Sequence, residues 1–346
     1  DLNDRLRGIP ALLKEQGYHV IGATMRLWTY SDSCNMKHEG CCAESAVEDA
    51  RRVCDKLGID FYVMNFKDMF KDKVVDYFVD EYIHGRTPNP CIACNKYLKF
   101  DALLKKALAM GIDYVATGHY AKIEKGEDGK YILRASEAVK KDQSYVLYNF
   151  TQEQLAHTLM PLGGYNKDWV RQKAEELGLG VAHKPDSQEI CFVEDDDYAK
   201  FITDYSGYKP KEGDILDVNG NVIGKHRGLI YYTIGQRKGI GAYGRPMFVM
   251  KIDAENNTIT LGEKGMEFSN ELTAYDVNFV SGEFPKENML ITAKVRYQAP
   301  PAAAMLCPQK DGTVKLMFPE PQRAVTPGQA VVFYDGDIVL GGGTVL

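Results

Sequence analysis

Apolar positions in the first half of the chain form short continuous runs that alternate with segments of helical spacing. The runs predict buried strands and are Tyr18–Met25, Ile59–Phe66 and Ile112–Thr117. The helically spaced segments predict helices and are Ala43–Leu57, Asp68–Ile83, Tyr97–Met110 and Asn166–Leu177. Strands that alternate with helices build a parallel, doubly wound α/β sheet, whose ligands bind at the carboxyl ends of the strands. Gly118 and His119 follow the third run, so we expect them to line a site.

The pattern changes near Gly213, where short strand-like runs are separated by turn sequences. The turns are Asn219-Gly220, Glu255-Asn256-Asn257, Asp311-Gly312 and Asp335-Gly336. We expect a small, Gly-rich central domain and, from about Asn270, a small β-barrel. Because a chain of 346 residues is too long for one ordinary core, we predict three domains, at residues 1–195, 196–266 and 267–346.

The composition is that of a soluble globular protein, with 45% hydrophobic and 26% charged residues. No apolar run reaches bilayer length and no signal peptide is visible, so we expect a cytoplasmic protein without a membrane partner. The chain does not begin with Met, which leaves a targeting segment open. Eight cysteines are few for a disulfide scaffold, and their clustering favours catalytic or metal-binding thiols.

Basic residues are concentrated between Lys225 and Lys251, although the net charge of −6 disfavours a general nucleic-acid binder. This stretch contains no Asp or Glu, and its basic residues are Lys225, Arg227, Arg237, Lys238, Arg245 and Lys251. A solvated basic face is the ordinary interpretation of such a run. Its length and its interleaved tyrosines favour contact with RNA phosphates instead.

Two cysteine-bearing motifs, Arg86–Asn95 and Asp186–Phe192, lie far apart in the chain. The prolines of Thr87–Pro90 fix φ and remove backbone donors, so this segment predicts a rigid loop. A thiol in a rigid loop suits sulfur chemistry or metal binding. A lone cysteine is ordinarily inert packing, which we expect of Cys54 and Cys307 and not of the motif cysteines.

Five short motifs occur in an order that is specific when they are taken together. They are Asn89-Pro90-x-x-Cys94-Asn95, Thr117-Gly118-His119-Tyr120, Lys141-Asp142-Gln143-Ser144-Tyr145, Asp186-Ser187-x-x-Ile190-Cys191-Phe192 and Tyr232-Thr233-Ile234-Gly235-Gln236-Arg237. From about Leu12 to its last residue, the chain resembles the bacterial tRNA-specific 2-thiouridylases of the MnmA type. The resemblance implies a first domain like the adenine nucleotide alpha hydrolases and PP-loop ATPases. It also implies ATP-dependent 2-thiolation of the wobble uridine of tRNA.

The resemblance gives the two motif cysteines distinct roles. It implies that ATP, with Mg²⁺, adenylates the C2 oxygen of the uridine, that Cys191 carries a persulfide, and that Cys94 is the partner thiol. A thiolate nucleophile needs a lowered pKa or cationic neighbours. Lys96 and Arg86 are close in sequence, and His119 is a further candidate.

The same resemblance assigns the remaining site residues. The ATP-binding residues are Met25 and Gly118. The residues that contact the target base or the tRNA are Asn89, Pro90, Cys91, His119, Lys141, Asp142, Gln143, Arg237, Lys238, Arg296, Tyr297 and Gln329. Without the resemblance, His119 is equally well explained as a buried, hydrogen-bonded histidine, and 141–143 as a polar turn. The implied partners are tRNAs of the Lys, Glu and Gln type and an upstream sulfur-donor protein.

Cys91 stands where many members of the family carry an aspartate. With Cys94 and Cys191 it offers three thiolates, which suits a [4Fe-4S] cluster with one open iron. Zinc is less favoured because no fourth ligand is obvious, and a resolving thiol is a third interpretation. We favour persulfide chemistry over the cluster. A separate group consists of Cys34, His38, Cys41 and Cys42. For this group we favour a mobile loop over a metal site.

The family's phosphate-binding loop, Ser-Gly-Gly-x-Asp-Ser, is absent, and Asp1–Pro10 stands in its place. Backbone N–H groups of such a loop bind the pyrophosphate of ATP, so its loss should weaken nucleotide binding. The alternatives are a truncated gene, omitted residues, or a catalytically impaired paralogue that binds tRNA or carries sulfur. The intact cysteines favour a fragment of an active enzyme. An ATP-pyrophosphatase for a small molecule is disfavoured by the basic, Tyr-rich segment.

Overall fold

The computed structural model describes residues 9–28, 44–137, 141–179, 190–193 and 196–346. These residues form two compact units. The first unit comprises the described parts of Asp1–Val74, Cys91–Phe192 and Asp337–Val339. The second unit comprises those of Val75–Pro90, Val193–Gly336 and Leu340–Leu346.

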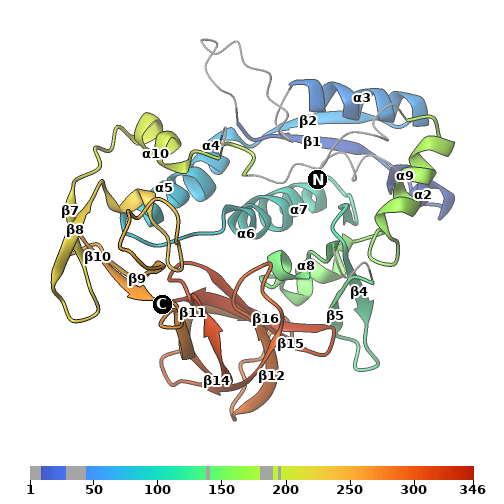
Figure 1. The fold of residues 1–346 in the computed structure, drawn as a ribbon. Coiled ribbons are helices and arrows are strands. Elements are labelled where there is room, and N and C mark those ends of the chain that lie inside the picture. The colour runs from blue at the N-terminus through green and yellow to red at the C-terminus, as the bar shows by residue number, and fades with distance from the viewer. Residues whose placement is uncertain (1–8, 29–43, 138–140, 180–189, 194–195) are drawn as a thin grey trace. The chain divides into compact units, whose positions relative to one another are not determined.

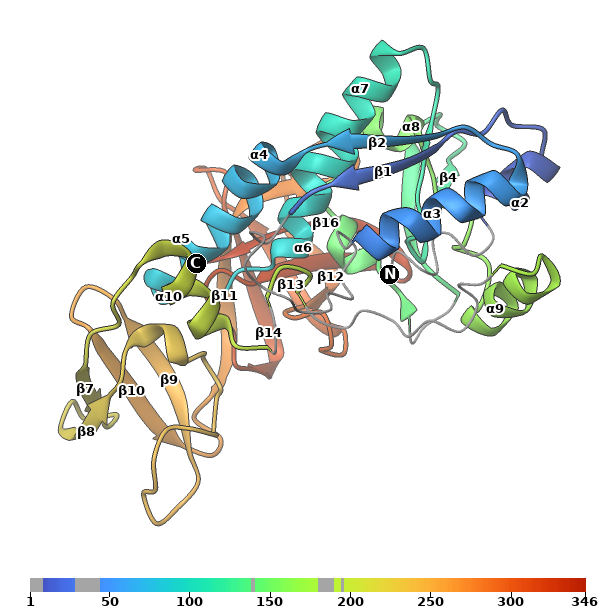
Figure 2. The same ribbon diagram turned by 90° about the horizontal axis from the view of Figure 1, so that it is seen from above.

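The first unit contains parallel strands joined by helices, as the alternating pattern predicted. Strand β1 (Gly22–Arg26) pairs in parallel with β2 (Phe61–Asn65), and helix α3 (Glu44–Leu57) connects them. The helix runs along both strands (Figures 1 and 2). Strand β3 (Val115–Ala116) pairs in parallel with β6 (Thr158–Leu159). Parallel pairing with helical connections confirms the predicted α/β class.

The other helical segments of the first unit cover these strands or connect them. They are α2 (Ile9–Glu15), α4 (Lys67–Phe70), η2 (Cys94–Ala102), α7 (Leu103–Ala109), η4 (Ser144–Leu147), α8 (Gln152–Ala156) and α9 (Lys167–Glu176). Helix α9 begins where sequence predicted, because the Asn166 side chain accepts a hydrogen bond from the Trp169 N–H at 2.8 Å. Val170 on α9 packs with Leu13 of α2 and with Tyr120 in one buried cluster.

An antiparallel hairpin in the first unit was not predicted from the sequence. It consists of β4 (Ala121–Lys125) and β5 (Tyr131–Ala135), with Gly129 at positive φ in the turn. Both strands are short and only partly buried, so they lack the apolar run by which the other strands were found. The turn sequence Glu127-Asp128-Gly129 was the available signal.

The second unit contains two helices, α5 (Tyr77–Ile83) and α10 (Tyr198–Ser206), which pack through aromatic rings. Phe78 lies 4.9 Å from Tyr82 and 6.0 Å from Tyr198 between ring centroids. The helical segment η1 (Lys71–Asp76) precedes α5, and the short η5 (Leu229–Tyr231) follows α10.

A four-stranded sheet and a closed barrel make up the rest of the second unit. The sheet has the order β8-β7-β10-β9 and consists of β7 (Gly213–Leu216), β8 (Val222–His226), β9 (Met247–Asp253) and β10 (Thr258–Glu263). The barrel strands are β11 (Phe268–Phe279), β12 (Met289–Lys294), β13 (Ala302–Pro308), β14 (Val314–Arg323), β15 (Ala330–Asp335) and β16 (Ile338–Val345). Their order is β11-β14-β13-β12-β15-β16, and the ring closes because β11 also pairs with β16. The predicted barrel is therefore confirmed.

The expected loop around the first cysteine motif is partly wrong. Helix α6 (Pro90–Ala93) begins seven residues earlier than the predicted helix Tyr97–Met110 and continues into η2, so that Cys94 lies in a helical segment. Proline suits the first position of a helix, where its missing N–H has no partner to lose. The rigid loop is confined to the residues before Pro90. No helix in the described part of the chain is long and apolar enough to span a membrane.

Candidate active site

Cys191 lies on the surface, and the residue after it is anchored in an aromatic cluster. Cys191 is exposed, whereas Phe192 is only 1% exposed. The Phe192 ring lies 5.7 Å from Phe70 and 6.5 Å from Trp28 between centroids. Trp28 is the second residue after the end of β1. The cluster therefore holds Cys191 near the carboxyl end of β1, where parallel sheets bind their ligands.

Cys94 is in the opposite environment, because it is 9% exposed and lies at the start of η2. Segment η2 is π-helical, a local departure from α-helix that is frequent at functional sites. The neighbouring Asn95 side chain donates to the Val146 carbonyl at 3.0 Å and accepts from Lys99 Nζ at 2.8 Å. These bonds fix the helix beside Cys94, whereas Cys91, one turn earlier, is exposed.

Arg86 and Lys96, the cations expected to assist the thiols, each contact a nearby side chain. Arg86 Nε donates to Glu81 Oε2 at 2.8 Å, and a second bond joins the same two side chains. The hydrogen bond to Glu81 raises the pKa of Arg86. Lys96 Nζ lies over the Tyr97 ring, 5.4 Å from its centroid.

The two loops predicted to line the site are hydrogen-bonded to each other. His119 is 1% exposed, and its Nδ1 lies 2.9 Å from Thr117 Oγ1. The Tyr120 N–H donates to Gln143 Oε1 at 3.0 Å, and the Gln143 N–H donates to the Tyr120 carbonyl at 2.9 Å. Gly118 is also buried. His119 thus has the environment of a packed, hydrogen-bonded histidine, and its contact with RNA stays a prediction.

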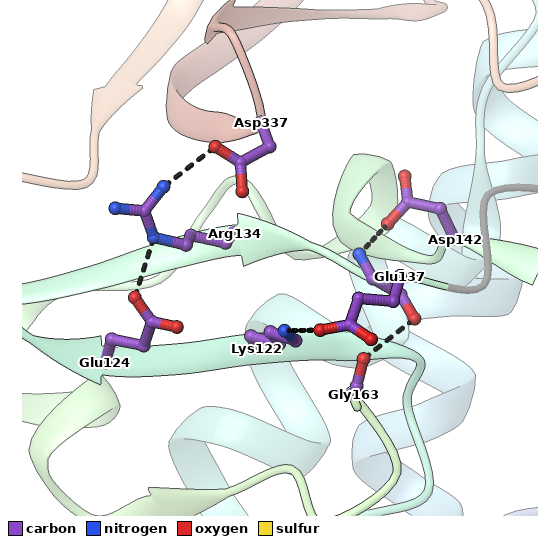
Figure 3. A network of polar contacts seen from close by, with 8 residues as sticks. Lys122, Glu124, Arg134, Glu137, Asp142, Gly163 and Asp337 are labelled. Atoms are coloured by element: carbon purple, nitrogen blue, oxygen red, sulfur yellow. Dashed lines mark hydrogen bonds and ion pairs between the residues drawn. The ribbon is translucent and has the colours of Figure 1, made fainter. Parts of the chain in front are cut away.

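The carboxylate of Asp142 accepts hydrogen bonds, one of which is drawn in Figure 3. Its carboxylate accepts hydrogen bonds from the Ser136 N–H at 3.0 Å, the Ser144 N–H at 3.2 Å and the Ser144 hydroxyl at 2.8 Å. The adjacent Glu137 forms an ion pair with Lys122 (Figure 3). The side chain of Asp142 therefore binds Ser136 and Ser144 and that of Gln143 binds Tyr120, while Lys141 is half-buried. Their predicted contacts with tRNA stay predictions.

Half of the basic residues between Lys225 and Lys251 are neutralised by acids that lie outside this stretch. The pairs are Lys225–Asp214 at 2.5 Å, Arg245–Glu263 at 2.5 Å and Lys251–Asp253 at 2.9 Å. Arg227, Arg237 and Lys238 are exposed and form no ion pair with a described residue. The basic surface is thus narrower than the sequence suggested, because these acids belong to other parts of the sheet.

Arg237 and Lys238 are presented by a loop whose shape depends on Gln236. The Gln236 side chain accepts from the Thr233 N–H at 2.9 Å and donates to the carbonyls of Tyr231 and Lys238, at 3.2 and 2.8 Å. The Val249 N–H donates to the Gln236 carbonyl at 3.0 Å, which ties the loop to β9. Sequence reasoning identified the two cations and missed Gln236 as the residue that orients them.

The remaining predicted tRNA contacts in the second unit differ in exposure. Tyr297 is exposed, with Lys294 Nζ 5.8 Å from its ring centroid. Arg296 and Gln329 are half-buried and donate hydrogen bonds to other parts of the same unit. Asn89 is half-buried and Pro90 is buried. In the first unit, Met25 is half-buried on β1, opposite Met64.

Metal binding was considered for two groups of cysteines, and the structure describes only one of them. Among the residues that the structure describes, no group of three or more His, Cys, Asp or Glu side chains is arranged to hold a metal ion. Cys91, Cys94 and Cys191 are described residues and form no such group, and an iron–sulfur cluster at these thiols stays a prediction. The group at 34–42 and the polar part of the second motif, 186–189, lie outside the described residues.

Cys54 has the packing role expected of it. It is buried, and burial raises the pKa of its thiol. Gly22, at the start of β1, leaves room for this sulfur, because a Cβ there would lie 2.4 Å from Cys54 Sγ. Cys307 is only partly buried on β13.

The parallel sheet, the four-stranded sheet and the closed barrel define a three-part protein built on a HUP domain. Residues 9–195 match the family model described as a tRNA methyl transferase HUP domain. Residues 199–263 match a tRNA methyl transferase PRC-barrel domain, and residues 269–345 an aminomethyltransferase beta-barrel domain.

Similarity to named proteins extends over nearly the whole chain. The chain is 58% identical to the tRNA-specific 2-thiouridylase MnmA of Acetivibrio thermocellus, over 97% of this chain and 94% of that protein. It is 57% identical to the protein of the same name from Clostridioides difficile, over 96% of this chain and 93% of that protein. The chain belongs to the MnmA family of tRNA-specific 2-thiouridylases, which confirms the resemblance seen in its motifs.

Proposed function

We propose that this protein catalyses the ATP-dependent 2-thiolation of the wobble uridine of tRNA. The observation that carries the proposal is that Cys94 and Cys191 belong to one compact unit, with Cys191 exposed near the carboxyl end of β1. Two cysteines in one α/β unit suit sulfur transfer, and the similarity to named 2-thiouridylases supports the same reaction.

The proposed reaction has three steps. ATP, as its Mg²⁺ complex, adenylates the C2 oxygen of the uridine, and pyrophosphate leaves. The terminal sulfur of a Cys191 persulfide then attacks C2, and AMP leaves with the electron pair of the C–O bond. Finally, the Cys94 thiolate attacks the Cys191 sulfur. The S–S bond breaks, its electron pair stays on the sulfur bonded to C2, and a Cys94–Cys191 disulfide forms.

The cycle needs two further reactants. A cellular dithiol reduces the disulfide, and an upstream sulfur-donor protein renews the persulfide on Cys191. An exposed Cys191 suits this renewal, because a protein donor must reach it. No step runs through an iron–sulfur cluster. The variants of Cys91 described below separate the two routes.

We assign the remaining roles as proposals of the same kind. Met25 and Gly118 bind ATP, and the segment 89–91 contacts the target base. The exposed Arg237, Lys238 and Tyr297 contact the tRNA, which is of the Lys, Glu or Gln type. Domains at 1–195, 196–266 and 267–346 carry these roles. The substrate places the reaction in the cytoplasm.

A tRNA-dependent ATP–pyrophosphate exchange assay tests the proposal. The full-length protein should exchange labelled pyrophosphate only when a tRNA with a wobble uridine is present. With a sulfur donor it should form 2-thiouridine, detected by mass spectrometry of nucleosides. Replacement of that uridine by cytidine should abolish both signals. Exchange that proceeds equally without tRNA would contradict the proposal.

A further inference from the structure

Asn95, the residue after Cys94, has a buried side chain that is hydrogen-bonded at both ends. Only 3% of this residue is exposed. Its Nδ2 donates to the Val146 carbonyl at 3.0 Å, and its Oδ1 accepts from Lys99 Nζ at 2.8 Å. A buried polar group that loses such a partner destabilises its surroundings, because water cannot replace the bond. The local structure at Asn95 is therefore sensitive to both contacts.

The segment that contains Asn95 has a backbone conformation that needs support. Segment η2 is π-helical over nine residues beginning at Cys94, whereas π-helices mostly occur as single turns within an α-helix. A rare backbone conformation persists where the surrounding structure holds it. Buried Leu98 and Phe100 hold the middle of η2 by packing. Asn95 supplies a polar contact at the end that carries Cys94.

Val146, which accepts the Asn95 hydrogen bond, belongs to a firmly packed part of the first unit. It lies in η4, between the buried side chains of Tyr145 and Leu147. The Val146 N–H donates to the Gln143 carbonyl at 3.2 Å. Because η2 and η4 belong to the same compact unit, the Asn95 side chain ties the start of η2 to a fixed point within it.

Lys99 determines which way the Asn95 amide points. Lys99 is half-buried and lies on η2, four residues after Asn95. An ammonium group can only donate hydrogen bonds, so it holds the amide oxygen on its own side. The amide nitrogen is thereby turned toward the Val146 carbonyl, which can only accept. The two hydrogen bonds thus support each other.

We infer that Asn95 and Lys99 are positioning residues for sulfur transfer, because they fix the backbone from which Cys94 projects. Attack by a thiolate on a persulfide depends on the direction of approach, so a small displacement of Cys94 slows it strongly. This inference rests on the proposed function, in which Cys94 acts after adenylation of the uridine. Adenylation itself does not use Cys94 and should not depend on either residue.

Asn95→Asp tests the inference when adenylation and sulfur transfer are measured separately on the full-length protein. Aspartate keeps the shape and still accepts from Lys99, but it cannot donate to the Val146 carbonyl. Formation of 2-thiouridine in a single turnover should slow about tenfold, the factor expected for one hydrogen bond. The tRNA-dependent ATP–pyrophosphate exchange rate and the Kd for tRNA should change less than about twofold.

Lys99→Met removes the other hydrogen bond, because methionine has no group that donates to the amide oxygen. It should reproduce the selective loss of 2-thiouridine formation. Unchanged thiolation in Asn95→Asp or in Lys99→Met would overturn the inference. So would a parallel loss of pyrophosphate exchange or of tRNA binding, which would indicate general damage to the unit.

Asn166→Ala is the matched control for lost stability. The Asn166 side chain accepts from the Trp169 N–H at 2.8 Å and caps α9 in the same unit. Its removal should lower the unfolding midpoint. Measured well below that midpoint, pyrophosphate exchange and 2-thiouridine formation should both equal those of the unmodified protein. A selective loss of thiolation in this control would contradict the inference, because destabilisation alone would then explain the Asn95 result.

Alkylation of Cys94 gives a readout that does not depend on activity. Iodoacetamide labelling with peptide mass spectrometry compares the buried Cys94 with the exposed Cys191 in one sample. The ratio of the Cys94 rate to the Cys191 rate should rise about threefold or more in Asn95→Asp, because a loosened η2 exposes the thiol. It should stay unchanged in Asn166→Ala. An unchanged ratio in Asn95→Asp would refute the positioning role. If the unmodified protein forms no 2-thiouridine, the proposed function fails, and the ratio alone decides whether Asn95 fixes Cys94.

Discussion

Cys191 and Cys94 differ in solvent exposure, which determines whether a reactant can reach the thiol. The exposed Cys191 can be reached by a donor protein, whereas the buried Cys94 is shielded from oxidants and from unwanted acceptors. This division suits a carrier and a partner that react only when the substrate is in place.

Serine at either position should abolish 2-thiouridine formation, because a hydroxyl cannot carry a persulfide or attack one. For Cys191→Ser and Cys94→Ser we expect nucleoside analysis to show no product and gel-shift Kd for tRNA to stay within about twofold. Cys307→Ser, a half-buried cysteine on the barrel, is the control and should keep full activity. Product formed by either of the first two variants would disprove their assignment.

Cys91 decides between the persulfide route and a cluster. Under the persulfide route, Cys91→Asp restores the commoner family residue and should stay active in air without bound iron. Under the cluster route, anaerobically purified protein should be brown and contain iron and acid-labile sulfide, and the variant should lose both and its activity. Assays of bound iron and sulfide, together with activity measured in air, distinguish the two routes. We expect the result of the persulfide route.

At the scale of elements, Gly22 at the start of β1 packs closely against Cys54 of α3. Gly22→Ala should destabilise the protein by about 1–3 kcal/mol, since the new Cβ would overlap Cys54 Sγ. Thermal unfolding should show a lower midpoint, and adding Cys54→Ala should recover part of the loss. Gly164→Ala, where the added Cβ meets nothing within 4 Å, should leave the midpoint nearly unchanged. An unchanged unfolding midpoint in Gly22→Ala would show that β1 can shift with little loss of stability.

The loop that carries Arg237 and Lys238 should account for much of the salt dependence of tRNA binding. Replacing both by alanine should weaken binding and reduce the slope of log K against log salt by about 1–2, because each lost phosphate contact removes one counterion release. The control is Arg245→Ala with Lys251→Ala, because these cations already pair with Glu263 and Asp253. If the control flattens the slope as much, the tRNA lies elsewhere.

Local patterns were sufficient for the class of fold and insufficient for several of its details. The helix Ala43–Leu57 was predicted within one residue of α3, because its apolar face repeats at helical spacing. The helix that contains Cys94 was predicted to begin too late in the chain. Proline is ordinarily a loop signal, whereas Pro90 here occupies the first position of a helix. Hairpin β4–β5 was missed because its strands are short and half-polar.

The site shows the same division between local and distant information. Motifs revealed Cys94, Cys191 and the exposed Arg237, because each belongs to a short recognisable segment. The hydrogen bonds of Arg296 and Gln329 join residues 62 and 242 positions apart. A single sequence contains no periodicity that reports such pairs, so these hydrogen bonds became visible only in the folded protein.

At the scale of the whole molecule, the contact between Thr87 and Gln329 has a consequence for biosynthesis. A ribosome that adds about 5–20 residues per second needs on the order of 10–50 s to proceed from one partner to the other. Throughout that interval the emerging α/β segment carries its cysteines without the barrel loop that steadies residue 87. The hydrogen bonds between Thr87 and the barrel loop can therefore form only late in synthesis, after most of the chain has left the ribosome.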